Sequence, residues 1–530
     1  DGGTSSNIGV QVQHLGSRIS SEAGDISITG QGGDGSGTTN NGVNVVEGAI
    51  VESTGTGDHA ANITIDGTAG NGSRYQFGVW VNAGTVGSVD GDISITGQGG
   101  DASGGDNHGI IVDNSAVVVT SGTGDIQLTG QGGDGIGGVN LGVLVFNGAV
   151  VESTGTTVDA GNITLVGTGG NGGGTNVGTV VTNNGAAVAS AAGNISLSGT
   201  GGNGTSNNNG VELSGTGSVS SVGGDIDFAG TAGATSGRGV LVTSDVSTAG
   251  GSIDITGTGS GDAASIEATG IDAGSGLVTL TAPTGIIQEA EAGTDIVGSN
   301  VTFNGEAAPG GTSATGQLII DGDVSFSGSD AYTVELNGLA AGADHDQLRL
   351  TGAGSAIDLD GATLNVTLGF TPAIGDEFVV IDNVDATSVV SGTFDGLAEG
   401  AVLAVGATTF HITYLGGTNN NDVVLTVFDN LPPTVNDQSF DVTENSINTT
   451  SLGNIAASDP NLPGDTLTYS VTGGTGTTAF AVDASSGEIT VIDSDQLDYE
   501  MTTSFTLDVT VTDAAGESDT AVVTIDVLKV

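Results

Sequence analysis

Acidic and amide side chains recur at short intervals through residues 436–530 of this 530-residue chain. They occur in the segments "TEN", "ASDPN", "LDYE" and "VTD", and the residues of interest are Glu444, Asp459, Asn461, Asp498, Glu500 and Asp513. Calcium takes six to eight oxygen ligands, and alternate carboxylates and carbonyls at the edge of a sheet can supply them. The pattern therefore predicts binding of a hard divalent cation, Ca²⁺.

The order and spacing of these segments resemble the motifs of a cadherin repeat, which run x-E-N, D-x-D, L-D-R-E and T-D. The resemblance implies a Greek-key β-sandwich with calcium ligands at its two ends. On the linker side it implies a half-site made of Asp429, Asn430, Asp459, Asn461 and Asp513. At the far end it implies a second half-site made of Glu444, Asp498 and Glu500.

Two departures from the cadherin pattern leave a simpler interpretation open. The family's linker motif D-x-N-D-N-x-P is here "TVFDNLP", in which Asp429, Asn430 and Pro432 match and Phe428 replaces an oxygen donor. Asn461 stands where the second aspartate of D-x-D is usual. The alternative is a set of solvated carboxylates inherited from a calcium-binding ancestor.

The first half of the chain repeats a short apolar strand followed by a glycine loop. The segment "GDISITGQGGDG" returns as "GDISITGQGGDA", "GDIQLTGQGGDG" and "GNITLVGTGGNG". The first isoleucine of each copy marks the period, at Ile26, Ile63, Ile93, Ile126, Ile163, Ile195, Ile226 and Ile253. A period in the tens of residues is typical of a repeat architecture.

Apolar and polar residues alternate in each copy, so that Ile26 and Ile28 share one face of a strand. A second strand follows the loop, as in "GVNV" at Gly42, and a third piece such as "GAIVESTG" at Gly48 completes the repeat. One triplet cannot bury its apolar face alone, whereas stacked copies pair every strand in parallel around an aliphatic interior. Residues 1–276 are therefore predicted to form a right-handed parallel β-helix.

The regular period ends near Leu277, and longer strands with irregular turns follow. Residues 277–428 are predicted to be a β-rich continuation of the solenoid or an irregular β cap. Their closing segment, with Phe410, Tyr414 and "NDVVLT", resembles the end of autotransporter-type and filamentous-haemagglutinin-like β-helices. Because the prolines of "DNLPPTV" block ladder pairing, residues 429–435 are predicted to link to a separate module at 436–530. The predicted fold class is all-β.

Composition narrows the classes of partner. The formal charge is -56, from 61 acidic and five basic side chains, and the chain has no cysteine. Phosphate binding needs clustered cations, so nucleic acid and anionic membrane surfaces are excluded as partners. No apolar run approaches the roughly 20 residues of a membrane helix, so no membrane insertion is expected. So acidic a surface should be stabilised by salt or multivalent cations.

Other candidate sites have simpler interpretations. The "GGDG" loops resemble the calcium turns of RTX proteins, but they recur once per coil and Asp becomes Asn in several copies, so we expect their glycines to serve turns with positive φ. Asp344, His345 and Asp346 are interpreted as a solvated turn, and the other histidines, including His108, as surface residues. Trp80, near Tyr75 and Phe77, could stack on a sugar ring or fill a corner of the coil.

Together these features predict a non-enzymatic, secreted or surface-displayed bacterial adhesin: a rigid stalk with a calcium-stiffened module for cell attachment or for building an extracellular or biofilm matrix. Its expected partners are other copies of itself, other surface proteins or glycans. Two alternatives remain open. One is a filament or sheath subunit that assembles head to tail. The other is a carbohydrate-binding or carbohydrate-active β-helix, whose sites usually need basic residues or clustered acids with aromatic platforms.

Overall fold

The computed structural model describes residues 6–260, 264–289, 295–311, 314–460 and 466–530. Within these ranges the chain forms strands and two 3₁₀ turns, η1 (Gly57–His59) and η2 (Ser494–Gln496), and no α-helix. No helix with the length and hydropathy of a membrane span occurs in this part of the chain. The chain divides into two compact units, residues 1–367 with 380–395 and residues 368–379 with 396–530. The predicted all-β class is confirmed.

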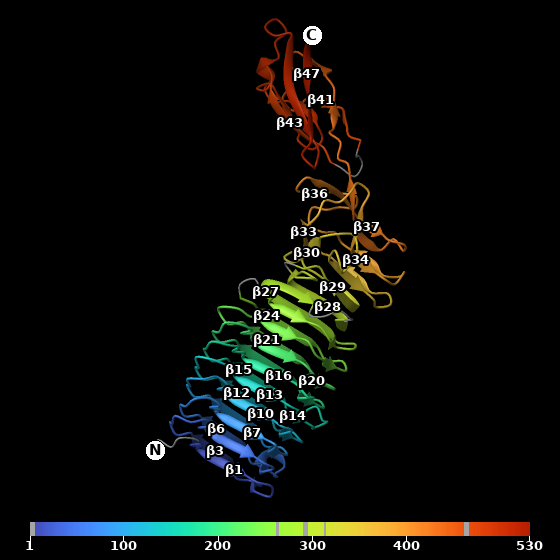
Figure 1. The fold of residues 1–530 in the computed structure, drawn as a ribbon. Helices are drawn as coiled ribbons and strands as arrows, with labels where there is room; N and C mark the ends of the chain where they lie inside the picture. The colour runs from blue at the N-terminus through green and yellow to red at the C-terminus, as the bar shows by residue number, and fades with distance from the viewer. Residues whose placement is uncertain (1–5, 261–263, 290–294, 312–313, 461–465) are drawn as a thin grey trace. The chain divides into compact units, whose positions relative to one another are not determined.

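Three strands make up each coil of the regular repeats, from β1 to β26 (Figure 1). The first coil contains β1 (Val10–Gln13), β2 (Arg18–Ser21) and β3 (Ile26–Gln31), and the second contains β4 (Val43–Val46), β5 (Ile50–Ser53) and β6 (Ile63–Thr68). Each strand pairs in parallel with the strand three places later, β1 with β4, β2 with β5 and β3 with β6. This arrangement is a parallel β-solenoid, as the sequence predicts.

The same pairing continues along three ladders. The first contains β3, β6, β9 (Ile93–Gln98), β12 (Ile126–Gln131), β15 (Ile163–Thr168), β18 (Ile195–Thr200), β21 (Ile226–Thr231) and β24 (Ile253–Thr258). The second contains β1, β4, β7 (Val79–Asn82), β10 (Ile110–Asp113), β13 (Val143–Phe146), β16 (Thr179–Thr182), β19 (Val211–Ser214), β22 (Val240–Val242) and β25 (Ile266–Ala268). The third contains β2, β5, β8 (Thr85–Ser88), β11 (Val117–Thr120), β14 (Val150–Ser153), β17 (Ala187–Ser190), β20 (Ser218–Ser221), β23 (Val246–Thr248) and β26 (Ile271–Asp272).

The solenoid core is a stack of aliphatic side chains in register. The isoleucines that mark the sequence period pair directly from coil to coil, from Ile26 with Ile63 through to Ile226 with Ile253. Those from Ile63 onward are at most 1% exposed. Alternation of buried and exposed residues along each strand puts this apolar face inside the coil. The repeat in the sequence therefore gives the register of the first ladder.

A column of buried amide side chains, which the sequence analysis missed, runs beside this core. Asn107 donates from Nδ2 to Oδ1 of Asn140 at 3.0 Å, and Asn140 donates in the same way to Asn176 at 3.0 Å. Asn40, Gln76 and Asn208 occupy the same column and are likewise fully buried. Each lies two residues before the glycine that precedes a second-ladder strand, and this constant spacing is the signal that could have revealed the column.

Many glycines of the repeats, including Gly32 in the first GGDG loop, serve close backbone approach, so the interpretation as a turn with positive φ is wrong at Gly32, whereas Gly48 and Gly148 do have positive φ. A Cβ added at Gly67 would lie 2.1 Å from the carbonyl oxygen of Gly78, and one at Gly32 would lie 2.1 Å from that of Asn40. Neither Gly67 nor Gly32 has a positive φ. Only glycine lets the end of a first-ladder strand come this close to the backbone that leads into the next second-ladder strand.

The loop aspartates stack as hydrogen-bond acceptors. Asp34 Oδ1 accepts the backbone N–H of Asn71 at 2.8 Å, and Asn71 Oδ1 accepts that of Asp101 at 3.0 Å. A parallel column begins with Asp25, whose Oδ1 accepts the N–H of Asn62 at 2.9 Å. Since Asp and Asn both offer an Oδ1 acceptor, their interchange between copies follows from this structural role.

Parallel pairing continues beyond residue 276. The first ladder runs from Ile253 to Val278 and then through Val301, Val324, Ile357 and Val390. The strands of this irregular region are β27 (Leu277–Glu289), β28 (Ile296–Ala307), β29 (Gln317–Ser325), β30 (Ala331–Leu336), β31 (Gln347–Leu350), β32 (Ala356–Asp358), β33 (Thr363–Leu368), β34 (Glu377–Asn383) and β35 (Val389–Ser391). In the second unit, β36 (Val402–Val405), β37 (Thr408–Gly416) and β38 (Asp422–Phe428) pair antiparallel.

The C-terminal module is a sandwich of short sheets (Figure 1). Its strands are β39 (Thr434–Val435), β40 (Gln438–Thr443), β41 (Ser451–Asn454), β42 (Ala457–Ser458), β43 (Thr468–Gly473), β44 (Phe480–Val482), β45 (Glu488–Val491), β46 (Ser504–Thr512) and β47 (Ser518–Leu528). One sheet has the order β40-β47-β46-β43 and another β41-β45-β44. Buried residues from both sheets, among them Phe480, Ile489 and Leu507, form one core. The loops at the ends of these strands carry the acidic residues.

Candidate metal centre in the C-terminal module

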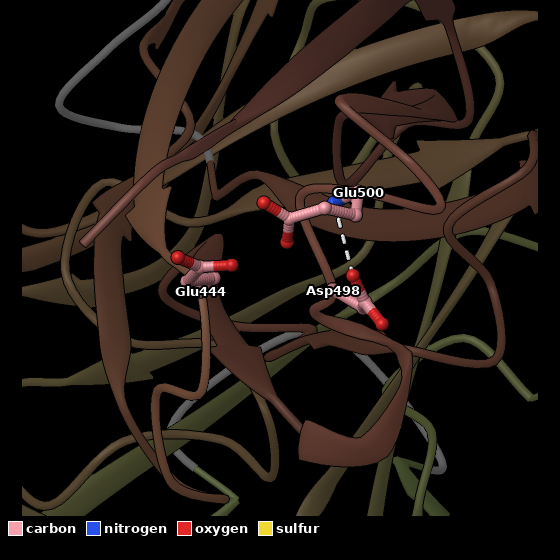
Figure 2. A group of neighbouring side chains, drawn as sticks. All are labelled: Glu444, Asp498 and Glu500. Carbon is pink, nitrogen blue, oxygen red and sulfur yellow. Dashed lines mark hydrogen bonds between the residues drawn. The ribbon is translucent and has the colours of Figure 1, made fainter.

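Three acidic side chains converge at one end of the module. Glu444 directly follows β40, while Asp498 and Glu500 lie in the loop between η2 and β46. One carboxylate oxygen from each lies within 4.8 Å of the others, and Figure 2 shows Glu444 and Glu500 turned toward one another. Within the described ranges no other three Asp, Glu, His or Cys side chains form such a group. The structure therefore brings together all three residues of the far-end half-site.

Backbone hydrogen bonds hold the cluster in place. Glu444 Oε1 accepts the N–H of Val530 at 2.9 Å, and its Oε2 accepts the N–H of Tyr499 at 3.4 Å. Asp498 Oδ1 accepts the N–H of Glu500 at 2.9 Å (Figure 2). Glu444 is half-buried, and Asp498 and Glu500 are exposed. The cluster thus offers oxygen atoms that are fixed on one side and open to solvent on the other.

A lysine, which the sequence analysis did not consider, occupies part of this cluster. Lys529 donates from Nζ to Glu500 Oε1, and its ammonium lies 5.6 Å from the centroid of the Tyr499 ring. The hydrogen bond with Lys529 lowers the pKa of Glu500, and the hydrogen bond with Glu500 raises the pKa of Lys529. The sequence does offer a clue to this contact, because Lys529 is one of only five basic residues in a strongly acidic chain. A bound cation would compete with this ammonium.

On the linker side, the structure brings Asn430 and Asp513 together. Asn430 Nδ2 donates to Asp513 Oδ2 at 2.8 Å, and Asp513 Oδ1 accepts the N–H of Glu517 at 2.8 Å. Asp513 is 5% exposed, and Asp459, which follows β42, is 7% exposed. Asp429 is exposed, and Asn461 lies outside the described residues. Of the predicted linker-side ligands, Asn430 and Asp513 therefore share a direct contact.

The amide oxygen of Asn430 is suited to cation binding. Asn430 Oδ1 is buried and has no hydrogen-bond partner among the described residues. A buried acceptor without a partner destabilises the fold unless something satisfies it. A hard cation next to the Asp513 carboxylate would do so, since amide and carboxylate oxygens are calcium ligands. The residues present at both ends of the module thus fit calcium.

Comparison with known proteins identifies a cadherin domain at the C-terminus. Residues 438–528 match the family model of the cadherin domain. No curated protein matches the chain. Two solved chains are similar: protocadherin gamma B2 extracellular cadherin domains 3–6, at 25% identity over 18% of this chain and 22% of that chain (TM-score 0.16), and the human desmocollin-1 ectodomain, at 20% over 23% and 25% (TM-score 0.18). The chain thus spans a quarter or less of either solved chain.

Two other sequence interpretations are wrong in the structure. His345 and Asp346, interpreted as a solvated turn, are 2% and 0% exposed. Asp346 accepts backbone N–H groups from Gly316 at 2.7 Å and from Glu335 at 2.8 Å, so it joins the segment before β29 to strand β30. His108, interpreted as a surface residue, is 5% exposed and stacks on Phe77 with ring centroids 5.4 Å apart. In both cases residues distant in sequence cover the side chain.

Proposed function

We propose that this chain is a non-enzymatic extracellular structural and adhesive protein of bacterial type. It has a rigid β-solenoid stalk and a calcium-stiffened cadherin domain, and it serves cell-surface attachment or matrix building. The proposal places the chain in the secreted or cell-surface fraction, since cadherin domains are extracellular modules. Its proposed partners are copies of itself, other surface proteins or glycans.

The observation that carries this proposal is the convergence of Glu444, Asp498 and Glu500 in a domain that matches the cadherin family. Three carboxylates whose oxygens lie within 4.8 Å repel one another unless a cation neutralises them. Lys529 neutralises one of them, which leaves an excess of negative charge.

Calcium would supply divalent charge and oxygen coordination at these sites. Glu444, Asp498 and Glu500 would hold it at the far end, and Asn430 and Asp513 would hold it on the linker side. In each case the ion would tie together segments distant in sequence, because Glu444 lies more than fifty residues from Glu500 and Asn430 more than eighty from Asp513. Such ties restrain the module and stiffen it.

Calorimetry of the full chain tests this proposal. Millimolar calcium should raise one melting transition relative to EDTA, whereas magnesium should raise it less because magnesium prefers rigid octahedral sites. The Asp498→Asn variant should lose most of that rise. The Asp441→Asn variant is the matched control, since it removes the same charge from an exposed residue of β40 outside the cluster. An equal calcium shift in wild type and Asp498→Asn would contradict the far-end site.

Assembly is a second possibility that the parallel ladders favour. The strands β1, β2 and β3 pair in parallel with β4, β5 and β6, and ladders of this kind can grow by adding strands at an edge. A head-to-tail filament or sheath would use such edges. Negative-stain electron microscopy of the full chain with calcium and with EDTA distinguishes filaments from single particles.

A further inference from the structure

An apolar groove lies on the outer face of the solenoid. The pairing register of the second ladder lines up one outward-facing side chain from each of four neighbouring strands. In the order β7, β10, β13 and β16, these side chains are Trp80, Ile111, Leu144 and Val180. The coils on either side carry Asn44 and Glu212 at the same position. The outer face of this ladder is therefore polar, then apolar over four coils, then polar again.

A second column changes over the same coils. Phe77, His108, Leu141 and Val177 lie three residues before these side chains, where the flanking coils have Asn41 and Asn209. In the flanking coils the columns are joined by side-chain hydrogen bonds, from Asn41 Nδ2 to Asn44 Oδ1 at 2.9 Å and from Asn209 Nδ2 to Glu212 Oε2 at 3.0 Å. Polar residues at these two positions fit the same coil geometry in the flanking coils. The fold therefore does not require the apolar residues found there in the four central coils.

Six of these eight residues, all but Val177 and Val180, line a hollow of about 590 Å³, within the range of small-molecule sites. Its walls include Trp80, Tyr75 and Phe146 as well as Phe77 and His108. Tyr75 is 39% exposed, and Trp80 and Phe146 are half-buried. Part of the ring surface that lines the hollow is therefore open to solvent.

A histidine with one ring nitrogen left for a ligand lines this hollow. His108 is 5% exposed and lines the hollow. Its Nδ1 accepts the backbone N–H of Leu141 at 3.1 Å, so the ring proton is on Nε2, and burial lowers the pKa of His108 to about 4. Nε2 is not one of the fully buried polar atoms that lack a partner, so this N–H is open to the surface of the hollow. A hydroxyl oxygen of a ligand in the hollow could accept from this donor.

The charged side chains around the hollow already have partners within the protein. Arg74 pairs with Asp106 and lies over the Tyr75 ring, 4.1 Å from its centroid. Asp113 Oδ1 accepts from Trp80 Nε1 at 3.2 Å and also from Asn82, while burial raises the pKa of Asp113. The hollow thus offers apolar ring faces, one N–H donor and carboxylate acceptors, with no unpaired cation. An anionic ligand would meet two carboxylates and a chain of net charge -56.

We propose that this groove binds an uncharged glycan, with sugar rings stacked on Trp80 and Tyr75 and a hydroxyl oxygen accepting from His108 Nε2. A pyranose ring combines apolar C–H faces with hydroxyl groups that both donate and accept, which matches this mixture of aromatic faces and polar atoms. A wholly apolar ligand would shield the His108 N–H from water without offering an acceptor. The proposal is independent of calcium, since none of the lining residues belongs to the C-terminal module.

Intrinsic fluorescence of the full chain tests the proposal directly, because Trp80 is the only tryptophan. Cello-, malto-, manno-, xylo- and chitotetraose are titrated separately in EDTA, with calorimetry as a second readout. At least one should shift the emission of Trp80 saturably and release matching heat. If no tetraose does so, the proposal is wrong.

Three variants locate the binding site. Tyr75→Ala removes an exposed ring and should weaken binding at least tenfold. His108→Asn removes the Nε2 donor but keeps an acceptor for Leu141 N–H, as Asn41 Oδ1 serves Phe77 N–H at 3.0 Å, and should also weaken binding. Ile136→Ala removes a side chain that is 82% exposed and does not line the groove, so it should bind like the wild type. Melting temperatures confirm that each variant folds.

Three results would overturn the assignment. The first is equal affinity in wild type and Tyr75→Ala. The second is tighter binding of an acidic oligosaccharide such as tetragalacturonate. The third is concentration-dependent dimerisation that Tyr75→Ala abolishes, which would assign the groove to a second copy of this chain.

Discussion

Asn430 donates a hydrogen bond from Nδ2 to Oδ2 of Asp513 at 2.8 Å, and these residues are 83 positions apart in the sequence. The contact ties the segment after β38 to the loop between β46 and β47. It leaves Asn430 Oδ1 buried without a partner among the described residues. This amide therefore marks the linker-side position where a cation would improve the structure.

Replacing Asn430 by alanine should weaken linker-side calcium binding by about tenfold, the scale of effect seen when a supporting group is lost from a metal site. The reason is that the variant loses both the free Oδ1 and the hydrogen bond that orients Asp513. Calorimetric titration of the full chain with calcium measures the change. Asn436→Ala, at an exposed amide nearby, is the matched control, and equal calcium affinities in the two variants would contradict the linker-side site.

Replacing Lys529 by glutamine should tighten calcium binding at the far end by ~2- to 5-fold, in line with the weak energies of exposed ion pairs. Calcium must displace the ammonium from Glu500, and glutamine carries no charge to displace. Calcium titrations at low and high salt measure the effect, which should shrink as salt screens the ion pair. Weaker calcium binding in Lys529→Gln would show that the lysine supports the site.

Acidification from pH 7.5 to pH 5 should stabilise the first unit. Burial raises the pKa of Glu289 to about 7 and the pKa values of Asp295 and Asp346 to about 6. Because these values lie above the ordinary carboxyl range, the folded state binds the protons more tightly than the unfolded state. This stabilisation is complete below the unfolded pKa values and is lost as pH rises through about 6 to 7.

The Glu289→Gln variant isolates this effect, because acidification also reduces the repulsion among the other carboxylates. It should melt a few degrees higher than wild type at pH 7.5 and depend less on pH between 5 and 7.5. Glu22→Gln, at an exposed residue of the same unit, removes one charge as the control. If the two variants show the same pH slope, the buried carboxylates do not cause it.

Replacing Gly67 by alanine should destabilise the solenoid by about 1 to 3 kcal/mol, the range for overpacking of a close contact. The added Cβ would lie 2.1 Å from the carbonyl oxygen of Gly78, so the two ladders would have to separate. Gly137→Ala is the matched control, since a Cβ there meets no atom within 4 Å and Gly137 has no positive φ. Urea unfolding compares the stability of the two variants. Equal unfolding midpoints would show that close backbone approach is not the reason why glycine occupies position 67.

Much of the solenoid was predictable because its geometry follows from the periodic spacing of apolar residues along the sequence. Alternation of apolar residues gives the buried face of each strand, and the recurrence of Ile26 at Ile63 and Ile93 gives the register of the ladder. The cadherin domain was predictable for a different reason, since its motifs occur in an order and spacing that resemble the family. The predicted domain boundaries and the remaining site residues stay predictions.

The sequence by itself determined the strand faces, the parallel register of the repeats and the excess of negative charge, because these depend on residue type and spacing along the chain. Only the tertiary structure decided which polar groups are buried and which charges meet. His108 and Asp346 are covered by segments distant in sequence, and Lys529 meets Glu500 through folding. Burial and ion pairing depend on what packs against a side chain, which periodicity along one strand does not specify.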